Sequence, residues 1–268
     1  MARLDDVRTA WCPGCCDFGE ADQAFTQGET NFYVCRTCQL TFRDPMPTAA
    51  ELVEIYKAHY RGSNIERGRT NQESGAFATA AYADYLIARL LNSQSRVLDF
   101  GAGTGLLVSA LRGRGIFADG VEFSAEARQH CAQFRGFDLF PDITLLAQDA
   151  YDVVTMIEVI EHLTDPIDDL KAVLQRLRSG GVLFLTTPNL NSLRAKVEGG
   201  NWREARKNFH LTLFESASLR RMLLKAGFSS VDTVRFSPIQ NSGLPNRIYA
   251  RVCQMGGFHG TLAMTARR

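Results

Sequence analysis

The chain has 268 residues, a formal net charge of +1, 45% hydrophobic residues and 22% charged residues. This composition is that of an ordinary globular protein, long enough for one large domain and a small appendage. The near-neutral charge argues against a polyanion as the main partner, and no apolar run reaches the roughly 20 residues of a membrane span. The first residues lack the apolar core of a signal peptide, so we expect a cytoplasmic, reducing location.

Four of the seven cysteines form two C-x-x-C pairs near the start of the chain. The pairs are CPGC and CRTC, which contain Cys12 and Cys15, and Cys35 and Cys38. Two such pairs about 20 residues apart predict a structural zinc site in which four thiolates leave no open catalytic position. Redox-active or unrelated thiols are the alternative, and the adjacent Cys16 could replace Cys15. We assign residues 1–45 to this zinc ribbon.

The predicted ribbon is acidic. Residues 1–45 contain four arginines against seven aspartates and glutamates, which gives a net charge of −3. Binding of phosphate groups requires a positive surface. We therefore expect that the ribbon does not bind nucleic acid.

Residues 46–94 read as a helical leader. Thr48 is a predicted helix N-cap, with Glu51 at the position of a capping box. A polar stretch follows, and the pattern over 75–92 predicts a longer helix. Three side chains between these helices are candidates for a lid over a neighbouring pocket: Tyr56, His59 and Tyr60.

From residue 96 onward, strand and helix patterns alternate. The expected strands cover 96–100, 117–123, 136–140, 151–159 and 182–188. The expected helices cover 104–115, 124–134 and 165–181. This alternation predicts a doubly wound α/β sheet that binds ligands at the carboxyl ends of its strands.

A glycine-rich turn follows the first of these strands. Gly101, Gly103 and Gly105 form G-x-G-x-G in LDFGAGTG, and glycines let backbone amides approach a ligand closely. A dinucleotide fingerprint needs glycine at position 106, which is leucine here, so pyrophosphate binding is disfavoured. Glu122 lies 21 positions after Gly101, at the end of the second strand, where a carboxylate can bind both hydroxyls of a ribose.

Charged groups also follow the strand at 151–159. Glu158, Glu161 and His162 occur within five residues in VVTMIEVIEHLTDP. Carboxylates are costly to bury without partners, so we expect this edge to meet a ligand or an ion. If the chain turns into a helix there, the i, i+3 and i+4 spacing places all three side chains on one face. His210, in NFHLTLF, is a fourth candidate.

Residues 189–214 form a basic segment with five lysines and arginines against two glutamates, a net charge of +3. Beside a pocket, such groups would suit a phosphate or carboxylate on the substrate, and a solvated helix face is an equal alternative. Trp202 and Phe209 are candidates for a substrate-facing wall, although a place in the core is favoured. The segment 236–260 is rich in glycine, proline and asparagine, and we expect His259 there to be incidental.

Several of these motifs resemble the class I S-adenosylmethionine (SAM)-dependent methyltransferases. VLDFGAGTG, GVEFS and EVIEHL carry the resemblance over residues 95–268, and CRTCQLTFRDPMPTAAELVEIY is similar to the zinc-ribbon leader of one bacterial branch. The resemblance implies a Rossmann-like seven-stranded sheet that ends in the antiparallel strand GTLAMTARR. It also implies a SAM site. In that site the three glycines line the methionine part and Glu122 holds the ribose, Asp99 orients the loop or the amino group, and Asp142 and Ile143 neighbour the adenine.

The Glu–Glu–His pattern also resembles that of certain SAM-dependent O-methyltransferases. In small-RNA 2′-O-methyltransferases, a similar Glu-x-x-Glu-His and a later histidine hold a divalent metal against the acceptor hydroxyl. Three interpretations stay open. Glu158, Glu161, His162 and His210 could bind a catalytic divalent ion; His162 or His210 could act as a metal-free base; or Glu161 and His162 could only cap a helix.

We therefore expect a SAM-dependent methyltransferase with a structural zinc ion. Its acceptor is expected to be a hydroxyl on a small molecule such as a sugar, a nucleotide-sugar or a natural product. The alternatives are an RNA methyltransferase that grips RNA with the ribbon, a sugar C-methyltransferase, and a SAM-binding regulator without catalysis. The intact glycine loop and the Glu–Glu–His pattern favour an enzyme.

Overall fold

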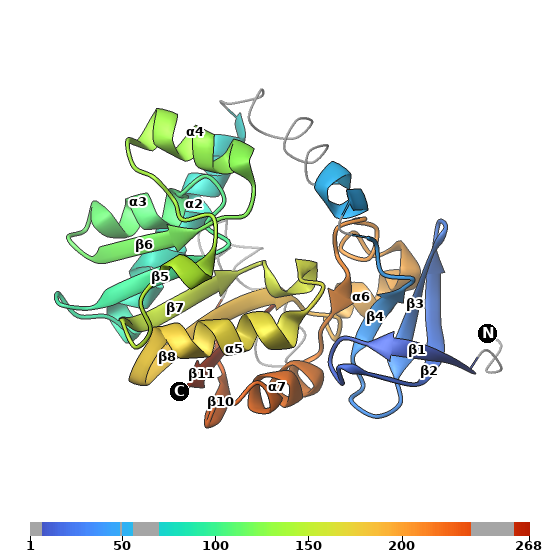
Figure 1. Ribbon diagram of the computed structural model, residues 1–268. Helices are drawn as coiled ribbons and strands as arrows, with labels where there is room; N and C mark the ends of the chain where they lie inside the picture. Colours follow the sequence, from blue (N-terminus) through green and yellow to red (C-terminus); the bar gives the residue numbers. More distant parts are fainter. Residues whose placement is uncertain (1–6, 49, 56–69, 237–259) are drawn as a thin grey trace.

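The computed structural model describes residues 7–48, 50–55, 70–236 and 260–268. They form two β-sheets, one in the ribbon and one in a larger α/β body (Figure 1). None of the helices in this part of the chain is long and apolar enough to span a bilayer. The lid candidates Tyr56, His59 and Tyr60, together with His259, lie outside the described residues.

The ribbon sheet is antiparallel and has the order β1-β2-β3-β4-β9. Its strands are β1 (Val7–Cys12), β2 (Asp17–Gln27), β3 (Thr30–Cys35), β4 (Thr41–Asp44) and β9 (Thr212–Leu213). β1 and β3 each end on the first cysteine of a C-x-x-C pair, so both pairs lie in turns at the same end of the sheet. The fifth strand comes from the body, about 170 residues further along the chain.

The body sheet has six strands in the order β10-β11-β8-β7-β5-β6. Their bounds are β5 (Arg96–Phe100), β6 (Phe117–Val121), β7 (Tyr151–Ile157), β8 (Leu177–Pro188), β10 (Ser230–Thr233) and β11 (Thr261–Arg267). Strands β6, β5, β7 and β8 are mutually parallel, and β11 is antiparallel to both of its neighbours. The predicted antiparallel last strand is therefore confirmed.

Helices cover both faces of this sheet, as a doubly wound fold requires. They are α2 (Thr70–Arg89), α3 (Leu106–Arg112), α4 (Ala125–Arg135), α5 (Pro166–Arg176), α6 (Leu193–Glu198) and α7 (Ser216–Lys225), with short 3₁₀ turns η1 (Ile143–Leu145), η2 (Ile160–His162) and η3 (Gly199–Asn201). Successive strand residues face opposite sides. Val97 packs into the core beneath α2 and α3, whereas Leu98 packs into the core beneath α5 and α7.

One predicted strand of the body is reduced to a single bridge. Residues 136–140 were expected to pair as a strand, but only Phe140 pairs, in parallel with Val121. Phe140 exchanges backbone hydrogen bonds with Gly120 and Glu122. The next residue is Pro141, which has no N–H to continue a ladder. Among the described residues the sheet consequently has six strands rather than seven.

The predicted helix starts are confirmed by their caps. The Thr48 amide donates to Glu51 Oε2 at 2.7 Å, and the Glu51 amide donates to Thr48 Oγ1 at 3.3 Å, which is a capping box. Ser124 Oγ accepts from the Ala127 amide at 3.1 Å at the start of α4. The expected helix over 75–92 corresponds to α2, which begins five residues earlier.

The ribbon and the body share one hydrophobic core. Cys12, Cys35 and Phe42 of the ribbon belong to the same buried cluster as Phe214 and Met222 of the body. α7 also contacts both cysteine turns. Arg221 donates to Cys38 O at 2.9 Å, and the Lys225 ammonium donates to Gly14 O at 3.2 Å and to Cys15 O. The boundaries at residues 45 and 94 remain predictions from the sequence. The hydrophobic packing is continuous across the first of them.

Candidate active site and metal centres

A cavity of about 680 Å³ opens at the carboxyl edge of the parallel strands. This volume is typical of small-molecule sites. One side is formed by the glycine loop and the end of β6, and the other by the chain that follows β7. The lining residues are Leu52, Val53, Gly101, Gly103, Glu122, Phe123, Ser124, Ala125, Glu126, Glu158, Val159, His162, Leu163, Thr164, Asp169 and Phe209.

The glycine loop lines this cavity through Gly101 and Gly103, and its backbone conformation favours glycine. Gly101, Gly103 and Gly105 all have positive φ angles, of 80°, 53° and 75°. A Cβ on Gly101 would lie 2.4 Å from Val159 Cγ2, and one on Gly105 would lie 2.5 Å from Cys131 Sγ. A Cβ on Gly103 would meet nothing within 4 Å, so this glycine leaves open the space that a ligand can use.

Glu122 joins the glycine loop to the end of β6. Its Oε2 accepts from the Gly103 amide at 2.7 Å, and its Oε1 accepts from the Ser124 amide at 2.8 Å. Burial raises the pKa of Glu122, and these two amides oppose the rise. Each carboxylate oxygen keeps a second lone pair, so both can also accept from the hydroxyls of a ribose.

Asp99 lies one layer below the cavity, within β5. The hydroxyl of Thr155 donates to Asp99 Oδ1 at 2.7 Å, and burial raises the pKa of Asp99 to about 6. Asp142 and Ile143, the expected adenine neighbours, do not contribute to the lining formed by the described residues. Asp142 instead accepts from the Thr144 amide at 2.7 Å and caps η1, and Ile143 is buried.

Phe123 is a lining residue that the sequence reading did not single out. It is 53% exposed and directly follows Glu122, at the mouth of the cavity. Leu163, Thr164 and Asp169 form a second such set after β7. Both sets follow the ends of parallel strands, and that position is the signal by which they could have been found.

The chain after β7 does not turn into an α-helix, which was the condition for placing the three side chains on one face. Glu158 adopts a left-handed φ of 54°, and the next residues form the 3₁₀ turn η2. Non-glycine residues rarely adopt such a φ, and in folded proteins it is often found at functional sites. The turn separates the three charged side chains. Glu158 and His162 line the cavity, and Glu161 points into the interior, where it is 1% exposed.

Glu161, His162 and His210 converge into one group, which we call the Glu–His cluster. One ligand atom from each lies within 4.8 Å of the others, and Glu158 falls outside this group. The two imidazole rings are 4.8 Å apart, and His162 Nε2 lies 3.8 Å from Glu161 Oε1. The expected four-residue set is therefore reduced to three, because the left-handed backbone turns Glu158 toward the cavity.

Hydrogen bonds hold the cluster in place but leave some of its atoms unsatisfied. His162 Nδ1 donates to Phe209 O at 2.9 Å, since a carbonyl can only accept. Thr187 Oγ1 donates to Glu161 Oε2 at 2.9 Å. Glu161 Oε1 and His210 Nδ1 are buried and form no hydrogen bond with another described residue, although His162 Nε2 lies 3.8 Å from the first atom and Glu204 Oε2 lies 3.9 Å from the second. Buried polar atoms normally have partners, so these two atoms are unusual.

The electrostatics of the cluster disfavour charged imidazoles. Burial lowers the pKa of His162, and burial together with His162 lowers the pKa of His210 to about 2. Burial raises the pKa of Glu161 to about 7, and burial with the charge of Glu161 raises the pKa of Glu158 to about 8. The site thus combines neutral imidazoles with carboxyl groups, Glu158 and Glu161, for which the described residues provide no ion pair with a lysine or an arginine.

This donor set fits a divalent metal ion. Two neutral imidazoles and one carboxylate are ligands that zinc, iron or manganese accept, and a cation would satisfy both unpartnered atoms. Ligand atoms on opposite sides of one ion lie about 4.4 Å apart at most, if each metal–ligand bond is about 2.2 Å. Small side-chain rotations would therefore bring the three groups onto one ion.

The cysteine cluster, formed by Cys12, Cys15, Cys35 and Cys38, fits a different kind of ion. Its four sulfur atoms lie within 4.8 Å of one another, with Cys12 and Cys38 separated by 3.4 Å and Cys15 and Cys35 by 3.6 Å. A zinc tetrahedron with Zn–S bonds of about 2.3 Å has S···S edges of about 3.8 Å. Cys16 is exposed and stands outside the cluster.

The four thiols cannot all ionise without a neighbouring cation. The hydrogen bond with Cys38 raises the pKa of Cys12, and burial raises the pKa of Cys15 to about 12. The hydrogen bond from Cys12 lowers the pKa of Cys38 to about 5. A bound zinc ion would replace this proton sharing by four thiolate bonds.

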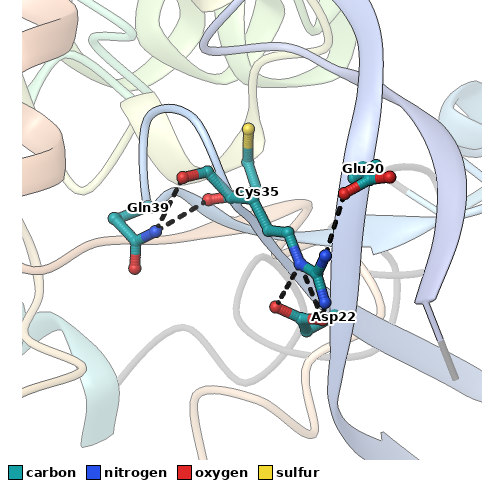
Figure 2. Close-up of polar contacts among 5 residues, drawn as sticks. Glu20, Asp22, Cys35 and Gln39 are labelled. Carbon is teal, nitrogen blue, oxygen red and sulfur yellow. Dashed lines mark hydrogen bonds and ion pairs between the residues drawn. The ribbon is translucent and has the colours of Figure 1, made fainter. Parts of the chain in front are cut away.

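Acidic neighbours bind two of the ribbon's arginines. Arg36 donates to both oxygens of Asp22 at 2.9–3.0 Å and to Glu20 at 2.8 Å, which ties the CRTC turn to β2 (Figure 2). Gln39 closes the same turn by donating to Cys35 O at 3.3 Å. Arg8 forms an ion pair with Asp44 at 2.8 Å. These pairs reduce the charge available for phosphate groups, as the net charge of the ribbon predicts.

Internal ion pairs also neutralise much of the basic segment 189–214. Arg194 pairs with Glu198 at 2.7 Å. Arg203 and Lys207 both pair with the nearly buried Glu204. The expectation of an anion site therefore loses support.

The two aromatic candidates of this segment lie in different surroundings. Trp202 is 4% exposed and packs in a small core with Phe32 and Leu213, as favoured from the sequence. Phe209 instead lines the cavity beside the ring of His162, with 5.3 Å between ring centroids. For Phe209 the favoured place in the core is therefore wrong.

The family profile described as "Methyltransferase domain" matches residues 73–233, more than half of the chain. The chain belongs to this methyltransferase family. The match covers the glycine loop, Glu122 and the Glu–His cluster. The resemblance seen in the sequence is thus confirmed.

Several proteins with a similar sequence or structure are also named methyltransferases. The ubiquinone biosynthesis O-methyltransferase of Aeromonas salmonicida is 35% identical over 106 residues, which cover 36% of this chain and 44% of that protein. The chain thus matches less than half the length of this relative. A SAM-dependent methyltransferase from Thermotoga maritima superposes with a TM-score of 0.56 at 21% identity, over 81% of this chain and 98% of that one.

A third similar protein was solved with ligands. The 1,6-didemethyltoxoflavin-N1-methyltransferase of Burkholderia thailandensis, with bound 1,6-didemethyltoxoflavin and S-adenosylhomocysteine, has a TM-score of 0.55 at 14% identity and covers 92% of this chain and 98% of its own. At these identities the two structures show the fold alone, and the methyltransferase fold of the body is confirmed.

Proposed function

We propose that this protein transfers the methyl group of SAM to a hydroxyl on a small-molecule acceptor, with a divalent ion held by Glu161, His162 and His210. The observation that carries the proposal is the Glu–His cluster beside the cavity, in which two buried ligand atoms form no hydrogen bond within the described part of the chain. The acceptor classes that we favour are sugars, nucleotide-sugars and natural products. The ubiquinone biosynthesis relatives are named O-methyltransferases, which supports oxygen as the methylated atom.

SAM would occupy the side of the cavity that the glycine loop forms. Gly103 leaves room there, and Glu122 presents both carboxylate oxygens at the end of β6. Phe123 is placed to cover an adenine ring with its exposed face. The sulfonium methyl would then point toward the half of the cavity that Glu158, His162 and Phe209 form.

Methyl transfer to a hydroxyl breaks the S–CH₃ bond, forms an O–CH₃ bond and releases the hydroxyl proton. A divalent ion would supply a Lewis acid that lowers the pKa of the acceptor hydroxyl. Thr187 and the Phe209 carbonyl orient Glu161 and His162 for that role. Glu158 lines the cavity, where its carboxylate would accept the proton.

The metal-free alternative is weaker for His210, whereas His162 keeps a lone pair on Nε2 beside the cavity and is the metal-free base that the test below has to exclude. An imidazole with a pKa of about 2, as His210 has, accepts a proton poorly at neutral pH. A buried neutral imidazole is instead well suited to binding a metal. The four cysteines would hold a separate zinc ion that stabilises the ribbon and takes no part in the transfer.

The test is to remove the ion of the Glu–His cluster while the ribbon zinc stays bound, and then to restore it. After mild chelation that leaves one zinc per chain in the ribbon, we expect Mn²⁺ to bind the wild type with one further site and the His210→Ala variant to lose that site. Methyl transfer from radiolabelled SAM to a panel of hydroxylated acceptors should require the added Mn²⁺. Full activity after chelation, with the ribbon zinc retained, would exclude the metal-assisted version. A protein that does not bind SAM would exclude the function altogether.

A further inference from the structure

The ribbon sheet includes a strand of the body that lies close in sequence to the cavity residue Phe209. Thr41 and Phe42 of β4 pair with Leu213 and Thr212 of β9, and the Arg43 amide donates to Leu211 O at 2.9 Å. The paired strand begins two residues after His210. The ribbon therefore determines the path of the chain that carries Phe209 and His210, although it lies about 170 residues away in sequence.

Arg43 holds this chain at two points. Its backbone amide binds Leu211 O, and its guanidinium donates through Nη1 to Asn208 O at 2.8 Å. The two bonds enclose Phe209, which lines the cavity, and His210, which belongs to the Glu–His cluster. We call residues 208–211 the acceptor segment.

The chain after β7 holds the acceptor segment from the opposite side. The Leu211 amide donates to Glu161 O at 2.7 Å, and His162 Nδ1 donates to Phe209 O at 2.9 Å. The second of these bonds also fixes the tautomer of His162, since a proton on Nδ1 leaves a lone pair on Nε2. The orientation of His162 thus depends on where the acceptor segment lies.

From these contacts we infer that Arg43, a residue of the zinc ribbon, positions the acceptor segment and thereby sets the geometry of the Glu–His cluster. Arg43 and η2 each form two hydrogen bonds with residues 208–211. Arg43 thus acts through Phe209, which lines the cavity, and through His210 rather than on the substrate. The inference rests on the proposed function, since it takes the Glu–His cluster as the site of an ion.

The substitution that tests the inference is Arg43→Met, which keeps an unbranched side chain and removes the bond to Asn208 O. The matched control is Arg221→Met. Arg221 also bridges body and ribbon, but it donates to Cys38 O at the cysteine cluster instead. Arg43→Lys keeps the charge and one donor that can reach Asn208 O, so it should recover part of the Mn²⁺ affinity and turnover that Arg43→Met loses.

Amide hydrogen exchange reports whether the acceptor segment is held in place, and it does not require an assay of activity. We expect the Leu211 amide to exchange faster in Arg43→Met than in the wild type or in Arg221→Met. Mn²⁺ affinity should fall about 10- to 100-fold, the usual effect of removing a group that orients metal ligands. SAM affinity and the ribbon zinc should be unchanged, and the loss of turnover should appear in kcat rather than in the KM for SAM.

The outcomes separate the two proposals. Equal Leu211 exchange in the wild type and in Arg43→Met would overturn the positioning role. Faster exchange with unchanged Mn²⁺ affinity would overturn it as well, because the segment would then be held without affecting the cluster. A wild type that binds no Mn²⁺ through His210 would instead refute the metal-assisted function, and Leu211 exchange would still decide whether Arg43 holds the segment.

Discussion

The cysteine cluster and the Glu–His cluster are the two groups of metal-ligand side chains in the described part of the chain, and they differ in chemistry and in access. The first has four sulfur ligands, enough to close a zinc tetrahedron. The second has one oxygen and two nitrogen ligands, and His162 opens onto the cavity. A closed site stabilises a fold, whereas a site with free coordination positions can bind a substrate atom.

The two clusters also depend on different parts of the fold. The cysteines come from two turns of one small sheet, and each pair is local in sequence. The Glu–His cluster needs η2 and the acceptor segment, which lie about 50 residues apart, and Arg43 of the ribbon holds the segment in place. Damage to the ribbon should therefore reach the active site, whereas damage to the active site should leave the ribbon intact.

The largest expected effect comes from breaking the cysteine cluster. Cys35→Ser removes one of four thiolates, and structural zinc supplies about 10–16 kcal/mol in zinc-finger peptides. A loss of several kcal/mol should lower the Tm by about 10 °C or more. Zinc per chain, measured by mass spectrometry, should fall from one to near zero.

The matched control for this substitution is Cys16→Ser, at an exposed cysteine outside the cluster. It should keep both the zinc and the Tm of the wild type. If Cys16→Ser lost zinc as Cys35→Ser does, the cluster would have been assigned to the wrong cysteines.

The next largest effect concerns the cavity side of the Glu–His cluster. His162→Ala should reduce turnover by roughly 10²-fold or more, the usual scale for loss of a group that handles the acceptor proton or its ion. SAM affinity and ribbon zinc should stay near the wild-type values. His130→Ala, at a half-buried histidine on α4, is the control. Wild-type turnover in His162→Ala would rule out both the metal and the base interpretations.

Much of the fold could be predicted from the sequence because its signals are local. The strand at 96–100, the caps at Thr48 and Ser124, and the two C-x-x-C pairs each depend on residues a few positions apart. The glycine loop was recognisable for the same reason, since positive φ angles and close packing require glycine at Gly101 and Gly105.

The remaining features depend on contacts between distant parts of the chain. β9 has two residues, too few for any periodicity, and it is a strand because β4 provides a partner. Glu204 neutralises two of the basic residues only because it is nearly buried beside them. The left-handed backbone at Glu158, which separates it from Glu161, also has no signature in the local residue types.

A smaller effect is expected from the residue that supports Glu161. Thr187→Val removes the hydroxyl that donates to Glu161 Oε2 while keeping the shape of the side chain. The buried carboxylate then has less support, and Mn²⁺ affinity should fall about tenfold. Thr155→Val, which removes the donor to Asp99, should leave Mn²⁺ affinity unchanged. Titration of each variant with Mn²⁺ distinguishes the two, and equal affinities would show that Thr187 does not support the cluster.

The smallest effect should follow from the ion pairs on the ribbon surface. Arg36 binds Asp22 and Glu20, but all three side chains are 46–65% exposed. Exposed pairs contribute little to stability and are screened by salt. Arg36→Met should therefore keep the zinc and the turnover, with a slightly lower Tm at low salt that approaches the wild-type value at about 1 M salt. A loss of zinc in this variant would mean that Arg36 supports the CRTC turn through more than surface charge, and the ribbon would then depend on Arg36 as the active site depends on Arg43.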